Sequence, residues 1–509
     1  MMQVLKGVDL TSKKWIAGLF LLLFVIRLYH LDGPLVDRHS WNQISTAATI
    51  KYMTMDWKYL LYPTVDVYVA PGYESRVYAQ EFPLYHIPAT LLNQWTGHLE
   101  ASARIVTIAF GMLGLWGWFL LSRKTAGDTV AWWTTLFWGF SPLNWFYQRA
   151  VMGDTSMVTG MIWGLYFFYL WLEQQQKKYL FYALLWTMAT GLFKPFGLVI
   201  GVSYLALIVL RKNYWCFRRW EIYVVALLAW LPTLLWIAHA LTLESGISEF
   251  ADVNNMNQIR HPELLLQWEF YSTLIGPRLL DSLLTPWIGI FFIGSLFSLR
   301  VTAIRYHIPI AWMSGCLMYL VIVQHGNFQH EYYQLPFGPG LCLLAGLGFE
   351  QFLGKNMKYP MVQTWFARLM IVLFILHATA YFYRFSRYDE GSYATGRKIA
   401  ELNDTPEARV LAWDIGSNKW NQMIYYSGLT GWCQNRELTP ELLELYRQHG
   451  ARWLGVNMLK ETHYPTFRPL LEKIETAYPL VWKNDQYPDR YQRKTMSLIF
   501  DLQPDAGLP

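Results

Sequence analysis

The sequence predicts a mostly α-helical, polytopic membrane bundle followed by a small α/β domain outside the membrane. Three observations predict this fold class. Only 15% of the residues are charged, whereas a soluble domain has about a quarter. Eleven apolar stretches approach the roughly 20 residues that a helix needs to cross the hydrocarbon core. Lys and Arg gather in alternate short loops, which is the pattern of the positive-inside rule.

The predicted spans begin near residue 15 and end near residue 384. The fifth and sixth are short and meet at Lys194 and Pro195, because proline ends the preceding helix. The eleven spans are 15–31, 102–122, 129–147, 155–173, 179–193, 195–211, 221–241, 286–300, 306–323, 334–353 and 363–384.

Orientation follows from the loops. If the N-terminus is cytoplasmic, every short inner loop carries at least two cations, and an odd number of spans puts the C-terminus outside. Residues 1–385 then form a membrane domain with long outer loops at 32–101 and 242–285. The first outer loop is rich in aromatic residues and proline, so we expect short interfacial helices there.

Residues 386–509 are predicted to form an outer α/β domain. Strand-like runs lie at 409–413, 452–456 and 497–502, and helix-like runs begin at Thr439 and near residue 467. Thr439 followed by Pro440 is typical of a helix start, with Thr as N-cap and Pro in the first turn. The domain has no Gly-rich phosphate loop, so the sequence assigns it no nucleotide-binding role.

The composition also limits the partners. The net charge is +6, but the cations are dispersed through short loops and form no patch, which excludes a nucleic-acid partner. The chain has 26 Trp and 33 Tyr residues. Interfacial belts account for most of them, with specific ligand stacking as the alternative.

Three acidic residues fall just past helix ends on the predicted outer side, namely Asp37, Glu81 and Asp154. A carboxylate at a membrane mouth is costly, so several on one face indicate a site. The ordinary alternative for Asp37 and Asp154 is helix N-capping, because Asp is a favoured cap. A helix that begins near His39 would also carry Gln43 on the same face.

Cations and aromatic residues lie on the same predicted side. Lys194 stands alone at the outer mouth, where it either binds phosphate or extends its charge towards water. His325, His330, Glu331, Tyr332 and Tyr333 crowd the loop between spans nine and ten. Their spacing matches no standard zinc motif, so a metal site is the less favoured interpretation of this loop.

The order of these residues resembles the GT-C superfamily of polyprenyl-phosphate-sugar glycosyltransferases, over about residues 15–385. Its protein O-mannosyltransferase and lipid A aminoarabinose transferase branch is the most similar. The matches are Asp37, the Pro-Leu-Tyr run at 83–85, Arg104, Asp154, the 190–195 run in place of Thr-Lys-Gly-Pro, and Tyr332 and Tyr333 followed by Leu335, Pro336 and a Gly-rich span. Residues 39–43 resemble a His-Ser-Trp-Arg-Gln motif of a bacterial subset.

Two positions depart from the resemblance. The mannosyltransferases often have Asp-Glu in the first loop, and here Arg38 follows Asp37. Where the aminoarabinose transferases have Lys before Pro-Pro-Leu, this chain has Glu81 before Phe82, Pro83 and Leu84. A negative group thus stands where a phosphate contact would be expected, so donor details do not transfer.

The resemblance implies an inverting glycosyltransferase in the bacterial inner membrane, with an extracytoplasmic active site. It would move a sugar from a polyprenyl-phosphate donor in the lipid to a lipid, glycan or protein acceptor. In this hypothesis Asp37 is the general base, which contributes about 10²–10⁴-fold in rate. Lys194 neutralises phosphate charge, and Asp154 and Glu81 orient the acceptor or the nearby cations.

The other residues assigned to substrate binding are His39, Gln43, Arg149, Arg278, His330, Tyr332 and Tyr333. Arg149 and Arg278 are candidates for the rest of the phosphate site. No organic cofactor is expected. A divalent ion between Asp37 and Asp154 is one source of positive charge, and Lys and Arg alone are the other.

Two other classes of function fit parts of the sequence. A lipid-linked sugar transporter or flippase would place its ionisable residues near the membrane midplane between repeated halves. Here the charges cluster at the outer interface and no repeat is visible. A non-catalytic subunit of envelope polysaccharide assembly, with the outer domain as its functional part, is the third alternative.

Overall fold

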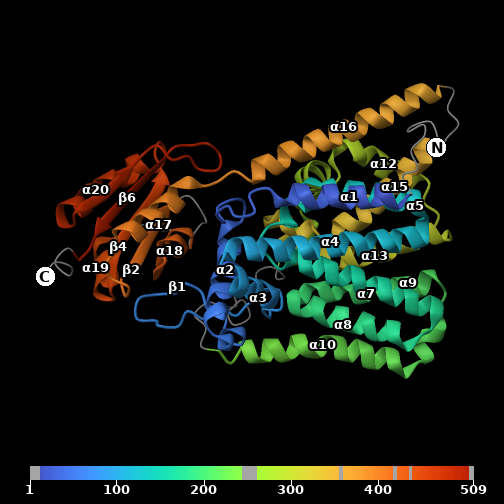
Figure 1. The fold of residues 1–509 in the computed structure, drawn as a ribbon, viewed down its shortest axis with the longest axis horizontal. Helices are drawn as coiled ribbons and strands as arrows, with labels where there is room; N and C mark the ends of the chain where they lie inside the picture. Colours follow the sequence, from blue (N-terminus) through green and yellow to red (C-terminus); the bar gives the residue numbers. More distant parts are fainter. Residues whose placement is uncertain (1–11, 244–260, 355–358, 416–420, 435–437, 504–509) are drawn as a thin grey trace.

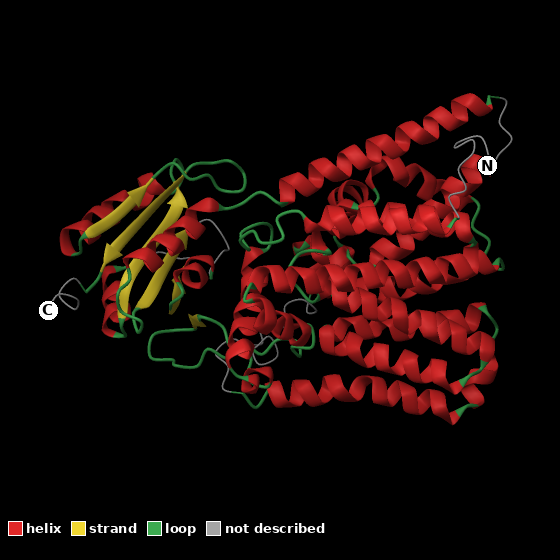
Figure 2. Cartoon of the chain, in the orientation of Figure 1, coloured by secondary structure: helices red, strands yellow, loops and turns green. Residues whose placement is uncertain are grey.

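The computed structural model describes residues 12–243, 261–354, 359–415, 421–434 and 438–503. Helices form a bundle that accounts for most of the chain, and a smaller α/β domain stands at one end of it (Figures 1 and 2). One large apolar core fills the bundle, and two smaller cores cover the two faces of the sheet. The predicted mostly helical fold with a C-terminal α/β part is confirmed.

Each predicted span overlaps a helix of the bundle. These helices are α1 Lys13–Val25, α4 Leu99–Ala126, α5 Asp128–Phe140, α6 Pro142–Tyr147, α7 Asp154–Gln174, α8 Lys177–Phe193, α9 Ile200–Leu210, α10 Trp220–Ala240, α12 Thr285–Phe297, α13 Ile304–Ile322, α15 Phe337–Gly354 and α16 Pro360–Phe385. In Figure 1, α10 and α16 lie at opposite edges of the bundle.

The length and composition of the helices bear on the number of spans. Among the described residues, four helical segments are long and apolar enough to cross a membrane: Leu99–Ala126, Asp154–Gln174, Trp220–Ala240 and Pro360–Leu402. A bent pair makes up to five. The other helices are shorter or interrupted, so the number eleven stays a prediction.

Proline interrupts the bundle in two places. Helix α8 ends at Phe193, Lys194 is extended, and a 3-10 turn begins at Pro195, as predicted. The predicted span 129–147 is divided into α5 and α6, because Ser141 adopts an extended conformation before Pro142. Proline disfavours a helical conformation in the residue before it and donates no backbone hydrogen bond.

The first outer loop contains helices, as predicted. They are α2 Ser40–Met55, the 3-10 turn Trp57–Leu60 and α3 His86–Thr96. The loop also contains β1 Val67–Tyr68, which pairs with the C-terminal sheet. Nothing in the sequence predicted this pairing, because it joins residues more than 360 positions apart.

The second predicted outer segment, 242–285, contains helices in its described part. Residues 244–260 lie outside the described part of the chain. Beyond them come the 3-10 turn Pro262–Leu266, α11 Trp268–Thr273 and a π-helix, Leu274–Leu283. The segment Trp268–Leu283 meets α12 at an angle of 108°, and Thr285 at the bend has a φ of 57°. The apolar residues of this segment form a helix that packs beside the bundle instead of an open loop.

The C-terminal domain is built on a six-stranded sheet with the order β1-β3-β2-β4-β6-β5. Strands β1, β3, β2 and β4 are parallel, and β6 is antiparallel to β4 and β5. The strands after β1 are β2 Arg409–Ile415, β3 Thr430–Gln434, β4 Ala451–Leu459, β5 Leu480–Asn484 and β6 Thr495–Asp501. The helices are α17 Glu390–Leu402, α18 Gln422–Ser427, α19 Pro440–Gln448 and α20 Tyr464–Ala477.

The predicted elements of this domain are found in place. The hydroxyl of Thr439 accepts a hydrogen bond from the Leu442 amide and caps α19, as the Thr-Pro sequence indicates. Backbone contacts join the first outer loop to the domain and to the helix that precedes it: Asp389 N donates to Val36 O at 3.0 Å, and Arg38 N donates to O of Phe385, the last residue of α16, at 3.2 Å. Asn421 also donates to Trp41 O. These bonds bring the sheet domain against the residues that follow Asp37.

Candidate active site

Three buried polar clusters are formed by the loops that follow α1, α6, α8 and α13, with a contribution from the π-helix. We name them the Asp37 cluster (Asp37, Gln43, Arg149), the Lys194 cluster (Glu81, Asp154, Lys194) and the Glu331 cluster (Arg38, His39, Tyr147, Arg278, Glu331). All eleven residues predicted for the site are members of a cluster or pack directly on one. His330, for example, stacks on Tyr332 and lies edge-on to His39.

In the Asp37 cluster, the Asp37 carboxylate is only 1% exposed. Its Oδ1 accepts a hydrogen bond from Gln43 Nε2 at 2.6 Å, and its Oδ2 lies 3.4 Å from Arg149 Nη1. Gln43 Oε1 accepts a hydrogen bond from the Val151 amide, so this side chain fixes the first outer loop to the loop before α7. A buried carboxylate needs such partners, since burying it alone would be very costly.

The capping alternative does not explain Asp37. Helix α2 begins at Ser40, and its N-cap is His39, which has a left-handed φ of 55°. Histidine is one of the few non-glycine residues that are enriched in this conformation. The turn at His39 directs Asp37 back towards Gln43, six residues later, in place of a helix-capping position.

In the Lys194 cluster, Lys194 Nζ lies 2.7 Å from Asp154 Oδ1. Asp154 is the first residue of α7 and makes no cap hydrogen bond, so the capping alternative fails here as well. Glu81 lies beside both groups and acts electrostatically on Lys194. A Cβ atom placed on Gly153 would lie 3.8 Å from Glu81 Oε1, which shows how closely this carboxylate approaches the start of α7.

Tyr332 and Tyr333 connect the Lys194 and Glu331 clusters. The Lys194 ammonium lies 5.2 Å from the ring centroid of Tyr332 and 5.4 Å from that of Tyr333. The Tyr332 ring also meets the His39 ring, with centroids 5.0 Å apart. Two buried aromatic rings thus separate an ammonium group from a network of guanidinium groups.

The Glu331 cluster is the most highly connected. Glu331 Oε1 lies 2.6 Å from Arg38 Nε and 3.1 Å from His39 Nε2, and Oε2 lies 3.1 Å from Arg278 Nη1. The Tyr147 hydroxyl donates to Oε1 at 3.1 Å. Arg38 also reaches the Tyr491 hydroxyl of the C-terminal domain at 3.5 Å. Four separate parts of the chain therefore meet at one carboxylate.

Charge differs between the clusters. The Asp37 cluster pairs one carboxylate with one guanidinium and is neutral. The Glu331 cluster sets two arginines against one carboxylate, which leaves one positive charge. The Lys194 cluster sets one lysine against two carboxylates, so it is negative when Glu81 is ionised and neutral when Glu81 is protonated.

Burial and these charges shift the proton affinities of the outer-loop groups. Burial raises the pKa of Glu81, with Lys194 opposing the shift and Asp154 adding to it. Burial would also raise the pKa of Glu331, but its contacts with His39 and Arg38 hold that pKa well below its usual range. Burial, with repulsion from His39 and the arginines, lowers the pKa of His330 to about 3. His330 is therefore neutral near pH 7.

Sequence reasoning missed the central position of Glu331 and the contributions of Arg38 and Tyr147. Arg38 and Glu331 are 293 residues apart, and no spacing rule connects them. Their signals were weak but present: Glu331 belongs to the crowded loop between predicted spans nine and ten, and Arg38 is the residue that departs from the family pattern after Asp37.

The residues present do not fit the divalent ion considered between Asp37 and Asp154. Each of these carboxylates already lies against a cationic side chain, Arg149 or Lys194. Across the described ranges, no group of three or more His, Cys, Asp or Glu side chains is arranged to hold a metal ion. Positive charge in this region comes from lysine and arginine.

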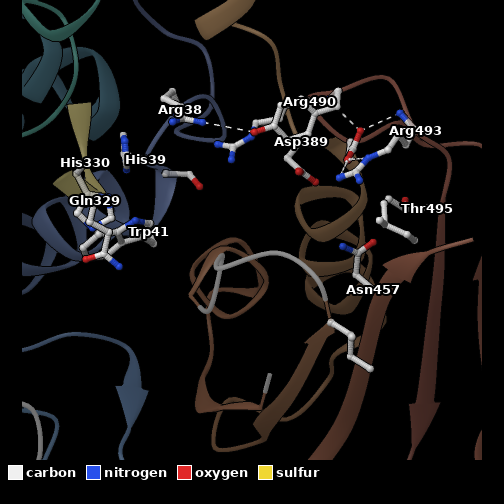
Figure 3. Close-up of a pocket in the computed structure, with 15 residues that line it drawn as sticks. Arg38, His39, Trp41, Gln329, His330, Asp389, Asn457, Arg490, Arg493 and Thr495 are labelled. Carbon is white, nitrogen blue, oxygen red and sulfur yellow. Dashed lines mark hydrogen bonds and ion pairs between the residues drawn. The ribbon is translucent and has the colours of Figure 1, made fainter. Parts of the chain in front are cut away.

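A cavity of about 430 Å³ opens between the Glu331 cluster and the C-terminal domain. Figure 3 shows Trp41, Gln329 and His330 on one side of it and Asn457, Arg493 and Thr495 on the other. Arg38 and His39 line the cavity and also contact Glu331. Asp37, Asp154 and Lys194 are not among its lining residues.

A family model described as dolichyl-phosphate-mannose-protein mannosyltransferase matches residues 83–236. The search of curated proteins gives no significant match. Among solved structures, ArnT from Cupriavidus metallidurans bound to undecaprenyl phosphate is similar, with a TM-score of 0.63, 14% identity, and coverage of 96% of this chain and 98% of that chain.

The oligosaccharyltransferase of Archaeoglobus fulgidus, in complex with Zn and sulfate, is also similar. Its TM-score is 0.62 at 10% identity, and the match covers 90% of this chain and 71% of that chain. The predicted resemblance to the GT-C superfamily is confirmed by these matches. At such low identities, what the structural matches establish is the fold.

Proposed function

We propose that this chain is an inverting membrane glycosyltransferase that moves a sugar from a polyprenyl-phosphate donor to a hydroxyl-bearing acceptor. The observation that carries the proposal is the Asp37 cluster, a buried carboxylate held by Gln43 and Arg149 in a GT-C fold. The undecaprenyl phosphate of the similar ArnT structure supports a lipid-phosphate donor. We further propose the bacterial inner membrane, with the C-terminal domain extracytoplasmic.

In the proposed reaction, the acceptor oxygen attacks the anomeric carbon from the face opposite the phosphate. The bond from that carbon to the phosphate oxygen breaks, and polyprenyl phosphate leaves with the electron pair. The acceptor proton passes to Asp37. For this step the carboxylate has to exchange part of its contact with Gln43 or Arg149 for the acceptor hydroxyl, since both of its oxygens are engaged without substrate.

The phosphate needs cations that hold it and stabilise the charge that develops as it leaves. Lys194, Arg149 and Arg278 are the proposed cations, and the net positive charge of the Glu331 cluster favours Arg278. Asp154 and Glu81 fix the position of Lys194 or bind sugar hydroxyls. His39, Gln43, His330, Tyr332 and Tyr333 complete the proposed substrate-binding surface.

The Asp37→Asn variant tests the proposal. It keeps the size and most hydrogen bonds of the side chain but removes the base, so we expect transfer to fall by about 10²–10⁴-fold. The measurement is release of polyprenyl phosphate by purified protein from a panel of polyprenyl-phosphate sugars, with membrane extract as acceptor. Asp32→Asn is the matched control, because Asp32 is exposed and only five residues away.

Two results would contradict the proposal. Full activity of Asp37→Asn would remove Asp37 from the mechanism. Movement of the intact lipid-linked sugar across a vesicle membrane, without cleavage by the wild-type protein, would replace the enzyme with a transporter.

A further inference from the structure

The cavity between the bundle and the C-terminal domain is a candidate for the acceptor site. At about 430 Å³ it falls within the range of small-molecule pockets. It adjoins the catalytic region through Arg38 and His39, which line it and also bind Glu331. The opposite wall comes from the C-terminal domain (Figure 3), so an occupant would touch both parts of the molecule.

The lining is unsuited to a lipid tail or an extended peptide. Charged and polar groups dominate the wall of the C-terminal domain, with Ile415 and Leu459 as its aliphatic members. An acyl chain would leave those polar groups unpaired. Extended peptides commonly pair with a sheet edge, and the lining strands are β2, β4 and β6, which all lie inside the sheet.

The cavity carries charges of both signs. Arg38, Arg490 and Arg493 contribute three positive charges to its lining, and Asp389 and Asp489 contribute two negative charges, while Arg38 is also paired with Glu331 outside the lining. Arg493 is paired with Asp489 at 2.6 Å. A strongly anionic or cationic ligand gains little from such a surface, whereas a neutral ligand with many hydroxyl groups finds both donors and acceptors.

Aromatic faces accompany these polar groups. Trp41 lies 6.3 Å from His330, ring to ring, and the Tyr491 side chain is 58% exposed. A ring with a polar edge can bury the apolar C–H face of a sugar while hydroxyl groups reach the charged side chains. Mixed charges, amide groups and exposed aromatic rings around one small cavity together match a carbohydrate.

From these observations we infer that the interdomain cavity binds a neutral glycan as the acceptor, and that Arg490 and Tyr491 of the C-terminal domain select it. This inference rests on the proposed function and names its acceptor class. Arg490 is suited to the role because its side chain lines the cavity and a guanidinium group carries several hydrogen-bond donors for sugar hydroxyl groups. Tyr491 also lines the cavity: its hydroxyl lies 3.5 Å from Arg38 Nη1, and its ring centroid lies 5.0 Å from the guanidinium carbon of Arg490.

The test uses purified full-length protein and three soluble probes: maltotriose, mannotriose and chitotriose. Binding is followed by saturation-transfer NMR and by tryptophan fluorescence. We expect at least one trisaccharide to bind the wild type, and Arg490→Ala and Tyr491→Ala to weaken its binding by about tenfold each, the effect of losing one hydrogen bond to a charged group or one ring contact. Arg468→Ala and Tyr73→Ala are controls of the same residue types with exposed side chains outside the cavity.

The outcomes are distinguishable. The inference is wrong if no trisaccharide binds, if the variants bind as the wild type does, or if a Ser/Thr-rich peptide or lysophosphatidylglycerol depends on Arg490 and Tyr491 instead. Hydrolysis of the polyprenyl-phosphate sugar, with water in place of the acceptor, is measured separately by the release of polyprenyl phosphate. This assay tests use of the donor without the glycan. If the wild type binds a trisaccharide but consumes no polyprenyl-phosphate sugar, the proposed function fails while the glycan site stands.

Discussion

Glu331 and Glu81 are both buried or partly buried carboxylates of the outer loops, and their surroundings differ in charge. Glu331 has Arg38 and Arg278 against it, so its cluster carries a net positive charge. Glu81 lies beside Lys194 and a second carboxylate, Asp154. One half of the site is therefore prepared for an anion such as phosphate, and the other half for hydroxyl groups or a cation. Tyr332 and Tyr333 stand between the two halves.

The largest effect is expected on stability, from removal of the Glu331 carboxylate that holds the positively charged half of the site together. Glu331→Ala leaves Arg38 and Arg278 without their buried carboxylate, and loss of one partner of a buried pair costs about 3–5 kcal/mol. The free energy of unfolding, measured by denaturant titration in detergent, should fall by about that amount. Glu263→Ala is the control, because its pair with His261 is exposed to solvent and pairs of that kind contribute little to stability. Equal losses would mean that Glu331 does not organise the site.

The next effect concerns the donor. Arg278→Ala removes a charge-assisted contact from the positive half, so the KM for the polyprenyl-phosphate sugar should rise about 10- to 100-fold. Lys194→Ala should also weaken donor use more than acceptor use, with a smaller ratio than Arg278→Ala. Steady-state kinetics with Lys58→Ala as an exposed control measure both ratios. A larger donor effect for Lys194 would move the phosphate to the other half.

The contributions of Glu331 and Glu81 to folding stability should depend on pH in opposite directions. The pKa of Glu331 is lowered on folding, so its stabilisation is present above about pH 4.5 and is lost as the pH falls. The pKa of Glu81 is raised, so its contribution favours the folded state at low pH and is lost as the pH rises above 4.5. Thermal unfolding from pH 3.5 to 7 should show less acid destabilisation in Glu331→Gln and less loss at higher pH in Glu81→Gln. Identical profiles for wild type and both variants would contradict the comparison.

The smallest effect is expected from metal removal. Arg149 and Lys194 already lie against Asp37 and Asp154, so dialysis against EDTA should change the transfer rate by less than about twofold. Add-back of Mg²⁺, Mn²⁺ or Zn²⁺ should then have no effect. Activity that disappears with EDTA and returns with one ion would show that a metal displaces these cations.

Local rules predicted much of this molecule. Proline placed the break at Lys194, and Thr439 with Pro440 placed the start of α19. Apolar stretches located the helices of the bundle, and the outer-side carboxylates located two of the three clusters. These features depend on residues near one another in the chain, so the sequence carries them directly.

The remainder depends on contacts between distant residues. Glu331 receives Arg38, Tyr147 and Arg278 from three other segments, and its place in a crowded polar loop does not reveal which distant side chains it contacts. The helices within 262–283 were not predicted individually, because 242–285 was assigned only as a segment between two spans. The cavity wall from the C-terminal domain was likewise beyond reach, since it exists only once two domains meet.

Strand β1 ties the two halves of the chain together mechanically. Its residues Val67 and Tyr68 belong to the same outer loop as Glu81, yet they are hydrogen-bonded to Gly431 and Trp432 in the distal sheet. Rotation of that sheet would pull directly on the loop unless these bonds broke first. A truncated chain that ends after α16 would also leave this stretch of backbone without its partner strand, so the membrane part is poorly suited to expression by itself.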